Sequence, residues 1–131
     1  RAAHEREVLR VVDDQHGSPT FAHDLAHATV EVVRRLGADP FATIDGHRGV
    51  YHAAGEGTVN RYDFARAIVD LDPQRATQTV RSVEPVPSSA YPLPAARPKH
   101  APLDCSKLTG RFAVTLRPWR EALERALRTS S

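Results

Sequence analysis

Sulfur and aromatic side chains are scarce in this sequence. Its 131 residues include one cysteine, Cys105, and no methionine, and Phe, Trp and Tyr together make up 6%. A single cysteine cannot form a disulfide within the chain, which is typical of a reducing compartment, and we therefore expect a cytoplasmic protein. Because the sequence also begins at Arg1, the lack of methionine leads us to expect a piece of a longer polypeptide.

Long apolar runs and an excess of one charge are also missing. Lys and Arg number 18 against 16 Asp and Glu, which leaves a formal net charge of +2 at pH 7. Nucleic-acid binders usually carry a clustered basic stripe, and no block of Lys and Arg interleaved with aromatic residues occurs here. No apolar stretch reaches the length that spans a bilayer. These absences argue against a nucleic-acid partner and against a membrane-spanning segment.

Proline is concentrated in one part of the chain. Six of the ten prolines lie between Pro85 and Pro102. Because proline cannot donate a backbone hydrogen bond and fixes its own φ angle, this window cannot be an ordinary helix or a central strand. Two interpretations stay open: a disordered linker, or an irregular but ordered loop that lines a site.

Three short segments are predicted to be strands. They are residues 8–12, 49–55 and 79–86, of which the second is largely apolar and lies between glycines, as buried strands do. A repeat of apolar side chains at steps of three and four predicts an amphipathic helix, with Thr20 as its cap and Gly37 at its end. The face that we expect to be buried consists of Ala22, Leu25, Ala26, Thr29, Val32, Val33 and Leu36.

Three further helices are predicted. Asn60, with a carboxylate three residues on, caps the first, which Pro73 ends. Asp104 is expected to cap the second, a short helix through Leu108 that Gly110 ends, and Pro118 begins the third. Because residues 49–71 follow the order strand, glycine turn and capped helix, the sequence predicts an α/β fold.

Three patterns resemble chemical sites but are better explained by structure. Gly55 and Gly57 form a two-glycine turn, yet neither G-x-G-x-x-G nor a P-loop is present, so a tight strand–helix connection is favoured. His23 and His27 have the spacing of a shared metal site but lack a third ligand, which favours surface or packing roles. Cys105 is a lone cysteine beside the proline-rich window and is favoured as a small apolar residue.

The loop after the first predicted strand is the strongest candidate for ligand binding. Residues 13–20 read Asp-Asp-Gln-His-Gly-Ser-Pro-Thr and place polar groups at the start of a helix. Gln15 and Thr20 can bind a polar ligand or can satisfy local backbone groups, and the spacing leaves both readings open. Arg97, followed by Pro98, is either a preorganised fork for phosphate or carboxylate or a solvated side chain.

Five segments, in this order, resemble landmarks of the dTDP-4-dehydrorhamnose reductase family. Residues 11–20 are similar to the family's V-x-D-Q-x-G-x-P-T segment. Residues 49–55, with the helix start at 62–65, are similar to G-x-Y-H-x-x-G. Residues 91–98 resemble Y-P-T-P-A-x-R-P, although Leu93 replaces the usual Thr and one of two paired arginines is absent. Residues 103–108 and 118–123 are similar to the last two landmarks.

The resemblance implies an α/β fold, the C-terminal part of an extended short-chain dehydrogenase/reductase. Residues 1–131 would then hold the end of a Rossmann-like sheet and a small substrate-binding domain, with the N-terminal cofactor-binding part absent. The family reduces dTDP-4-dehydro-L-rhamnose to dTDP-L-rhamnose with NADPH. Neither its Gly-rich cofactor motif nor its catalytic Tyr-x-x-x-Lys occurs here, so we expect no catalytic residue and no activity in this chain alone, and NADPH bound mainly by the N-terminal part.

Site residues carry over by the motif match. Gln15 and Thr20 would face the sugar nucleotide, Arg97 would oppose its diphosphate, and Gly17 and Pro19 would shape the loop. Some members bind Mg²⁺ through acidic residues, but no residue here matches such a site, and we assign no metal ligand. The expected partners are a dTDP-sugar and, because residues 49–55 need neighbouring strands, a second copy or a chain that supplies the missing part.

Two other hypotheses stay open at this point. The first is a non-catalytic interaction module derived from a reductase, and upstream sequence would decide it, because an active parent needs the glycine-rich turn and the Tyr/Lys pair. The second is part of another nucleotide-sugar reductase or epimerase, which the five landmarks together disfavour.

Overall fold

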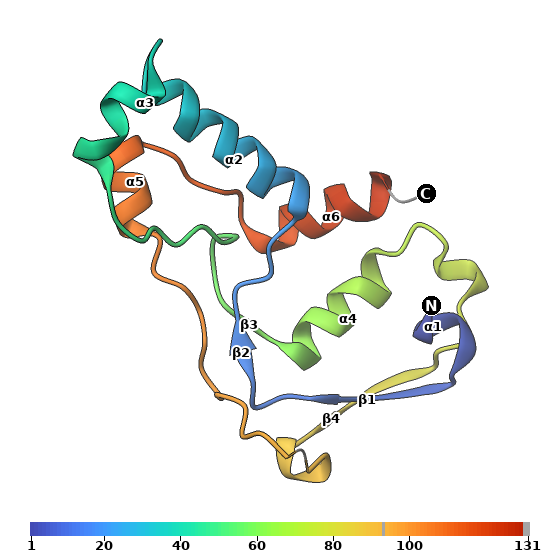
Figure 1. Cartoon of the computed structure of the whole chain (residues 1–131). Coiled ribbons are helices and arrows are strands. Elements are labelled where there is room, and N and C mark those ends of the chain that lie inside the picture. The colour runs from blue at the N-terminus through green and yellow to red at the C-terminus, as the bar shows by residue number, and fades with distance from the viewer. Residues whose placement is uncertain (93, 130–131) are drawn as a thin grey trace.

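The computed structural model describes residues 1–92 and 94–129 (Figure 1). Leu93, the position at which the proline-rich stretch departs from the family pattern, lies outside them. The strands are β1 (Val8–Val12), β2 (His16–Gly17), β3 (Val59–Asn60) and β4 (Ser82–Val86). The helices are α1 (Ala2–Glu5), α2 (Ala22–Arg35), α3 (Pro40–Thr43), α4 (Arg61–Leu71), α5 (Ser106–Phe112) and α6 (Trp119–Thr129), with 3-10 turns η1 (Ile44–His47), η2 (Arg75–Thr77) and η3 (Ser88–Ala90).

The described strands form two small sheets. β1 and β4 are parallel, from Val8 opposite Ser82 to Val12 opposite Val86, and α4 packs on this pair (Figure 1). β2 and β3 are antiparallel, with His16 opposite Asn60. The first and third predicted strands are therefore confirmed, the third over a shorter range. β4 tolerates a proline because it pairs with β1 on one side only among the described strands.

Residues 49–55, predicted to be a buried strand, are extended but form no strand with any described part of the chain. The N–H of Gly55 donates to the hydroxyl of Thr20 (3.0 Å) instead of to a neighbouring strand. The prediction is wrong because a strand requires a second strand beside it. The predicted burial holds only at the end of the segment: Ala54 is 5% exposed and Gly55 is buried, whereas Val50 is 76% exposed.

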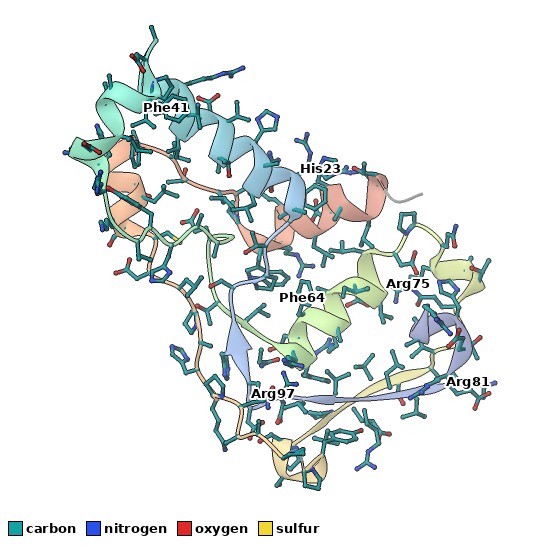
Figure 2. All side chains as sticks on the ribbon, viewed as in Figure 1. His23, Phe41, Phe64, Arg75, Arg81 and Arg97 are labelled. Carbon is teal, nitrogen blue, oxygen red and sulfur yellow. The ribbon has the colours of Figure 1, made fainter. Side chains whose placement is uncertain are left out.

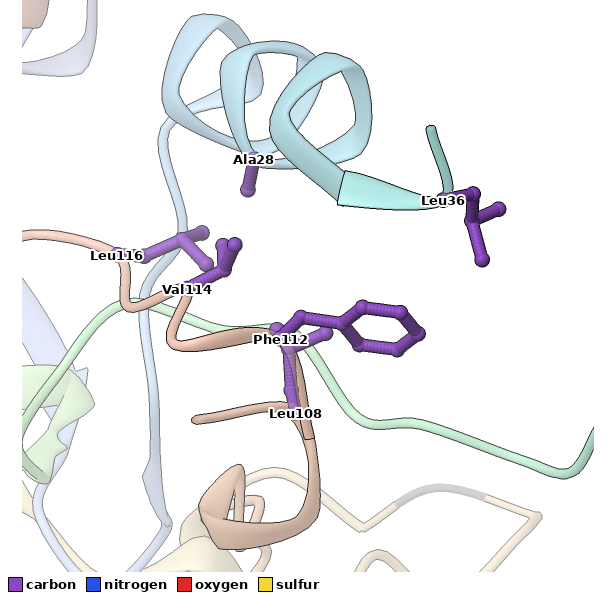
Figure 3. Close-up of a cluster of buried hydrophobic side chains, with 6 residues drawn as sticks. All are labelled: Ala28, Leu36, Leu108, Phe112, Val114 and Leu116. Carbon is purple, nitrogen blue, oxygen red and sulfur yellow. The ribbon is translucent and has the colours of Figure 1, made fainter. Parts of the chain in front are cut away.

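The main core lies between α2, α5 and the segment that follows α5 (Figure 3). The ring of Tyr51 meets that of Phe112 edge to face, with 5.3 Å between centroids, and so joins the extended segment to the core. The buried cluster consists of Ala28, Leu36, Leu108, Phe112, Val114 and Leu116.

α2 presents only part of its predicted face to this core. Leu36 is buried and Val32 packs against the cluster, as predicted. Five of the predicted positions are exposed, so the prediction is wrong there: Leu25 (39%), Val33 (48%), Ala22, Ala26 and Thr29. The physical reason is that apolar side chains lie on both sides of the helix, as the 48% exposure of Val30 also shows, and the described residues cover one of them.

The helix ends follow local signals in most cases. The side chain of Asn60 accepts from the N–H of Asp63 (2.7 Å), and α4 ends two residues before Pro73, as predicted. Gly37 follows α2 with a φ of +92°, the left-handed conformation expected of a glycine stop. The predicted cap of α2 is wrong: Phe21 occupies that position, because the hydroxyl of Thr20 is engaged elsewhere.

Two boundaries near the C-terminus also differ from prediction. α5 runs through Gly110 to Phe112 and ends at Ala113, whose φ is +47°. Leu108 and Phe112 are one helical turn apart and both buried, so their packing extends the helix past the glycine. α6 begins at Trp119, one residue after Pro118.

Among the described helices, none combines the length and the apolarity needed to cross a bilayer. The proline-rich window is not a uniform coil: it contains the end of β4 and all of η3, and a later part forms backbone bonds with β2. The described residues of this window are therefore irregular in structure but held by backbone contacts with β1 and β2, which favours the second interpretation.

Candidate ligand-binding site

A cavity of about 350 Å³ lies where the loop after β1, the start of α4 and the proline-rich stretch (the described part of residues 85–102) meet. No carboxylate is among the described side chains that line it, whereas two arginines are, so its charge favours an anionic ligand. Arg97 lies beside the region where β1 gives way to β2, and Phe64 lies on α4 (Figure 2). The lining residues are Gln15, His16, Gly17, Ser18, Pro19, Val59, Asn60, Arg61, Phe64, Arg97, Pro98 and Ala101.

Backbone hydrogen bonds from β2 bring these three segments together. The N–H of Arg61 donates to the carbonyl of Gln15 (3.1 Å), which places the start of α4 against the loop. The N–H of His16 donates to the carbonyl of Lys99 (2.8 Å), and that of Ala101 donates to the carbonyl of His16 (3.0 Å). The proline-rich stretch thus lies along β2 on the side opposite β3.

Four of the five predicted site residues meet at this cavity. Gln15 and Arg97 line it, and the side chain of neither forms a hydrogen bond or ion pair with any described residue. The amide and the guanidinium are therefore free to bind a ligand, one as donor and acceptor, the other as a planar fork of donors. Gly17 and Pro19 form part of the wall.

Thr20 is the predicted site residue that does not line this cavity. Its hydroxyl donates to the carbonyl of Ser18 (3.1 Å) and accepts from the N–H of Gly55 (3.0 Å). The local backbone role that the sequence left open for Thr20 is thus present in the structure, and a role in ligand binding stays a prediction.

Arg61 and Phe64 belong to the cavity but were missed in the sequence. Both lie in the first turn of α4, and the side chain of Arg61, like that of Arg97, has no partner in the described residues. No local pattern predicts this placement, because it depends on the pairing of β2 with β3. The cavity is thus lined by two arginines whose side chains have no partner in the described residues, Arg97 from the proline-rich stretch and Arg61 from α4.

Beside the cavity, the carboxylate of Asp14 gathers three donors. Its oxygens accept from the N–H (3.0 Å) and the hydroxyl (2.9 Å) of Ser88, and the ammonium of Lys99 lies 3.0 Å away. The hydrogen bond from Lys99, followed by those from Ser88, lowers the pKa of Asp14 below its ordinary range, against an opposing contribution from burial. The carboxylate is therefore ionised at neutral pH.

The turn at Gly55 and Gly57 has two of its backbone amides bonded within the chain. The N–H of Gly55 is bonded to Thr20, and that of Glu56 donates to the carbonyl of Arg117 (3.1 Å). A Cβ at Gly55 would meet the carbonyl oxygen of Pro19, so packed backbone already fills the space. The amides of Gly55 and Glu56 are thus engaged within the chain. Because no described strand directly precedes this turn and β3 follows it, the strand–helix connection favoured from the sequence is not formed.

The two histidines and the cysteine considered in the sequence do not line this cavity. His23 stacks on Phe21, with 4.9 Å between ring centroids, whereas His27 lines a different cavity together with Asp24. Within residues 1–92 and 94–129, no group of three or more His, Cys, Asp or Glu side chains is placed to hold a metal ion. Cys105 directly precedes α5, with its sulfur 3.8 Å from the carbonyl of Leu103.

Comparison with known proteins adds a family to this geometry. A family model described as "RmlD substrate binding domain" matches residues 1–131. The chain belongs to this family. A dTDP-4-dehydrorhamnose reductase of Burkholderia thailandensis is 38% identical, over 94% of this chain and 42% of its own length. One of Mycobacterium tuberculosis is 41% identical, over 96% of this chain and 36% of its own length.

Solved structures of the same enzymes share the fold. A Bacillus anthracis dTDP-4-dehydrorhamnose reductase in complex with NADP matches with a TM-score of 0.79 and 28% identity, over all of this chain and 41% of that one. A Clostridium acetobutylicum reductase matches with a TM-score of 0.76 and 29% identity, over 96% of this chain and 40% of that one. The resemblance inferred from sequence landmarks and the predicted fold class are both confirmed. The chain spans about two-fifths of the length of these relatives.

Proposed function

We propose that this chain is the substrate-binding part of a dTDP-4-dehydrorhamnose reductase and that it binds a dTDP-sugar in the cavity between β2, α4 and the proline-rich stretch. The single observation that carries the proposal is the meeting of two unpaired arginines and an unpaired amide in one cavity without a carboxylate. A nucleoside diphosphate sugar presents complementary groups: two ionised phosphates and a polar sugar.

In the proposed complex each residue has a role that its chemistry suits. Arg97 and Arg61 reach the diphosphate from opposite walls, one from the proline-rich stretch and one from α4, since guanidinium groups bind phosphate oxygens through paired N–H donors. Gln15 donates to and accepts from the sugar hydroxyls or the base. Gly17 and Pro19 keep the loop backbone in shape.

The reductase activity itself belongs in this proposal to the whole protein. The relatives are named as reductases, and one of them holds NADP, but the G-x-G-x-x-G fingerprint of a dinucleotide site does not occur in this sequence. We therefore assign the binding of NADPH and the transfer of hydride to the part of a whole reductase that lies outside the region matched by this chain. Over residues 1–131 the proposed contribution is to bind and orient the sugar nucleotide.

Calorimetric titration of the chain with dTDP tests the proposal. We expect saturable binding, weakened by Gln15→Ala at an unchanged melting temperature, because the amide has no partner in the protein to lose. Gln74→Ala is the matched control, since that side chain is exposed and distant from the cavity. The absence of dTDP binding by a folded chain would contradict the proposal.

A second measurement tests the division of labour. The chain alone, mixed with NADPH and a dTDP-4-keto sugar, is expected to leave the nicotinamide absorbance constant. Turnover by the pure chain would show that it holds a cofactor site and catalytic groups, and would overturn the assignment of these to another part.

A further inference from the structure

The Asp14 carboxylate joins two points of the proline-rich stretch that are distant along the chain. It binds Ser88 through both the backbone N–H and the hydroxyl, and it binds the ammonium of Lys99. Ser88 lies just after β4, and Lys99 lies two residues after Arg97. The side chain of Asp14, on the loop after β1, therefore holds the proline-rich stretch at two points, Ser88 and Lys99.

The attachment near Arg97 is the more restrictive of the two. The carbonyl of Lys99 accepts from the N–H of His16, so its backbone and its side chain are both held, the latter by Asp14. Pro98 stands between Lys99 and Arg97, and its ring limits the conformation of both its own backbone and that of the preceding residue. Few backbone rotations are thus left between the anchored Lys99 and Arg97.

Direct ligand binding by Asp14 or Lys99 explains these contacts less well. Neither residue lines the cavity, and an ionised carboxylate would repel a diphosphate. The side chain of Lys99 is 72% exposed, yet the side chain of Asp14 is only 25% exposed, and its carboxylate has three donors around it. The arrangement is that of a fixed support beside the cavity.

We propose that Asp14 is a positioning residue, whose carboxylate fixes the proline-rich stretch so that Arg97 is already in place to receive the diphosphate of the ligand. The inference rests on the proposed function of the cavity. The proposed effect on affinity is preorganisation. A proline-rich stretch that is already ordered loses little conformational entropy when the ligand binds, so more of the contact energy remains as affinity.

The test compares Asp14→Asn with the wild-type chain by NMR and calorimetry. Without nucleotide, we expect faster hydrogen exchange at the amide of Ser88 and a lower backbone order parameter at Arg97. The dissociation constant for dTDP should rise about tenfold, a coupling within the usual range for residues of one network. Asp45→Asn is the matched control, because it breaks an exposed ion pair with Arg48 and should change neither quantity.

A double-mutant cycle separates positioning from general stability. If Asp14 acts through Arg97, then Asp14→Asn should weaken dTDP binding no further in a chain that already carries Arg97→Gln. Ser88→Ala removes the hydrogen bond from the hydroxyl to Asp14 and keeps the ion pair with Lys99, so its loss of dTDP affinity should be smaller than that of Asp14→Asn. This variant replaces Asp14→Asn in the cycle if Asp14→Asn does not fold.

The outcomes are distinguishable. Additive losses in the cycle, or unchanged exchange at Ser88 and unchanged order at Arg97, would overturn the positioning role while leaving the dTDP site intact. A wild-type chain that binds no dTDP would instead contradict the proposed function on which the inference rests.

Discussion

The hydroxyl of Thr20 accepts a hydrogen bond from the backbone N–H of Gly55 over 3.0 Å and so joins the cavity loop to the extended segment before β3. Gly55 is buried, and a buried amide without a partner is costly. The same hydroxyl donates to the carbonyl of Ser18, so it is engaged both as donor and as acceptor. The contact gives Thr20 a structural role in the loop that carries Gln15.

Thr20→Val should therefore lower stability more than ligand affinity. Valine keeps the shape of threonine but leaves the amide of Gly55 unpaired, at an expected cost of about 1–2 kcal/mol of unfolding free energy. Thr20→Ser retains the hydroxyl and should lose less. Chemical denaturation and dTDP titration of both variants make the comparison. Normal stability with weak dTDP binding in Thr20→Val would show that the hydroxyl contacts the ligand.

Two glycine substitutions are expected to have opposite effects. A Cβ at Gly55 would meet the carbonyl oxygen of Pro19, which belongs to packed backbone, so Gly55→Ala should destabilise by about 1–3 kcal/mol. Gly110 lies inside α5 with no atom near its missing Cβ, so Gly110→Ala should stabilise by about 0.5–1 kcal/mol. Melting temperatures decide both. A stable Gly55→Ala chain would mean that the extended segment moves freely away from the loop.

Signals carried by a few adjacent residues predicted the local structure well. The Asn60 cap, the end of α4 before Pro73 and the glycine stop after α2 depend on backbone groups close in sequence. The buried face of α2 could not be predicted as well, because periodicity shows which residues are apolar and not which neighbour covers them. The extended segment 49–55 shows the same limit, since its strand propensity does not supply a pairing strand.

The candidate site divides in the same way. The loop residues Gln15, Gly17 and Pro19 were predictable because they follow one another in a recognisable pattern. Arg61 was not, because it enters the cavity only through the pairing of β2 with β3 and the bond from its N–H to Gln15. The hydroxyl of Thr20 could not be assigned between ligand and backbone until Gly55 was placed beside it.

Asp72 should make stability depend on pH in the acid range. Its carboxylate accepts from the side chain of Gln78 (2.8 Å) and the N–H of Gln74 (2.9 Å), and it pairs with His4, which together lower its pKa from the ordinary 3.8. Because the pKa of Asp72 is lower in the folded chain than in the unfolded chain, the ionised carboxylate stabilises the fold above pH 3.8. This stabilisation is lost as the pH falls through the pKa that Asp72 has in the folded chain.

Asp72→Asn should accordingly reduce unfolding free energy at neutral pH, with the difference from wild type shrinking as the pH falls below 3.8. Denaturant titrations from neutral to acid pH measure that difference. Asp45→Asn, at an exposed ion pair, is the control and should differ little from wild type throughout. A difference for Asp72→Asn that is constant over the whole range would indicate lost packing and not a lost charge.

Substitutions at Arg97 separate charge from geometry in the proposed diphosphate contact. Arg97→Lys keeps the positive charge but loses the planar fork of donors, so dTDP affinity should fall partway. Arg97→Gln also removes the charge and should cost more, on the order of 2 kcal/mol of binding free energy. Arg61→Gln should resemble Arg97→Gln, because both side chains are unpaired in the same cavity.

Arg120→Gln controls for the loss of net charge, because Arg120 is exposed on α6 and does not line the cavity. All titrations are repeated at higher salt, which screens long-range attraction between charges. The diphosphate contact predicts that Arg97→Gln loses affinity at both salt concentrations, since bound phosphates are held by short, directed hydrogen bonds. If the Lys and Gln variants bind dTDP as tightly as the wild type, Arg97 is a solvated loop residue and the phosphates bind elsewhere. If only Arg61→Gln weakens binding, the contact lies on α4, and the proline-rich stretch merely borders the cavity.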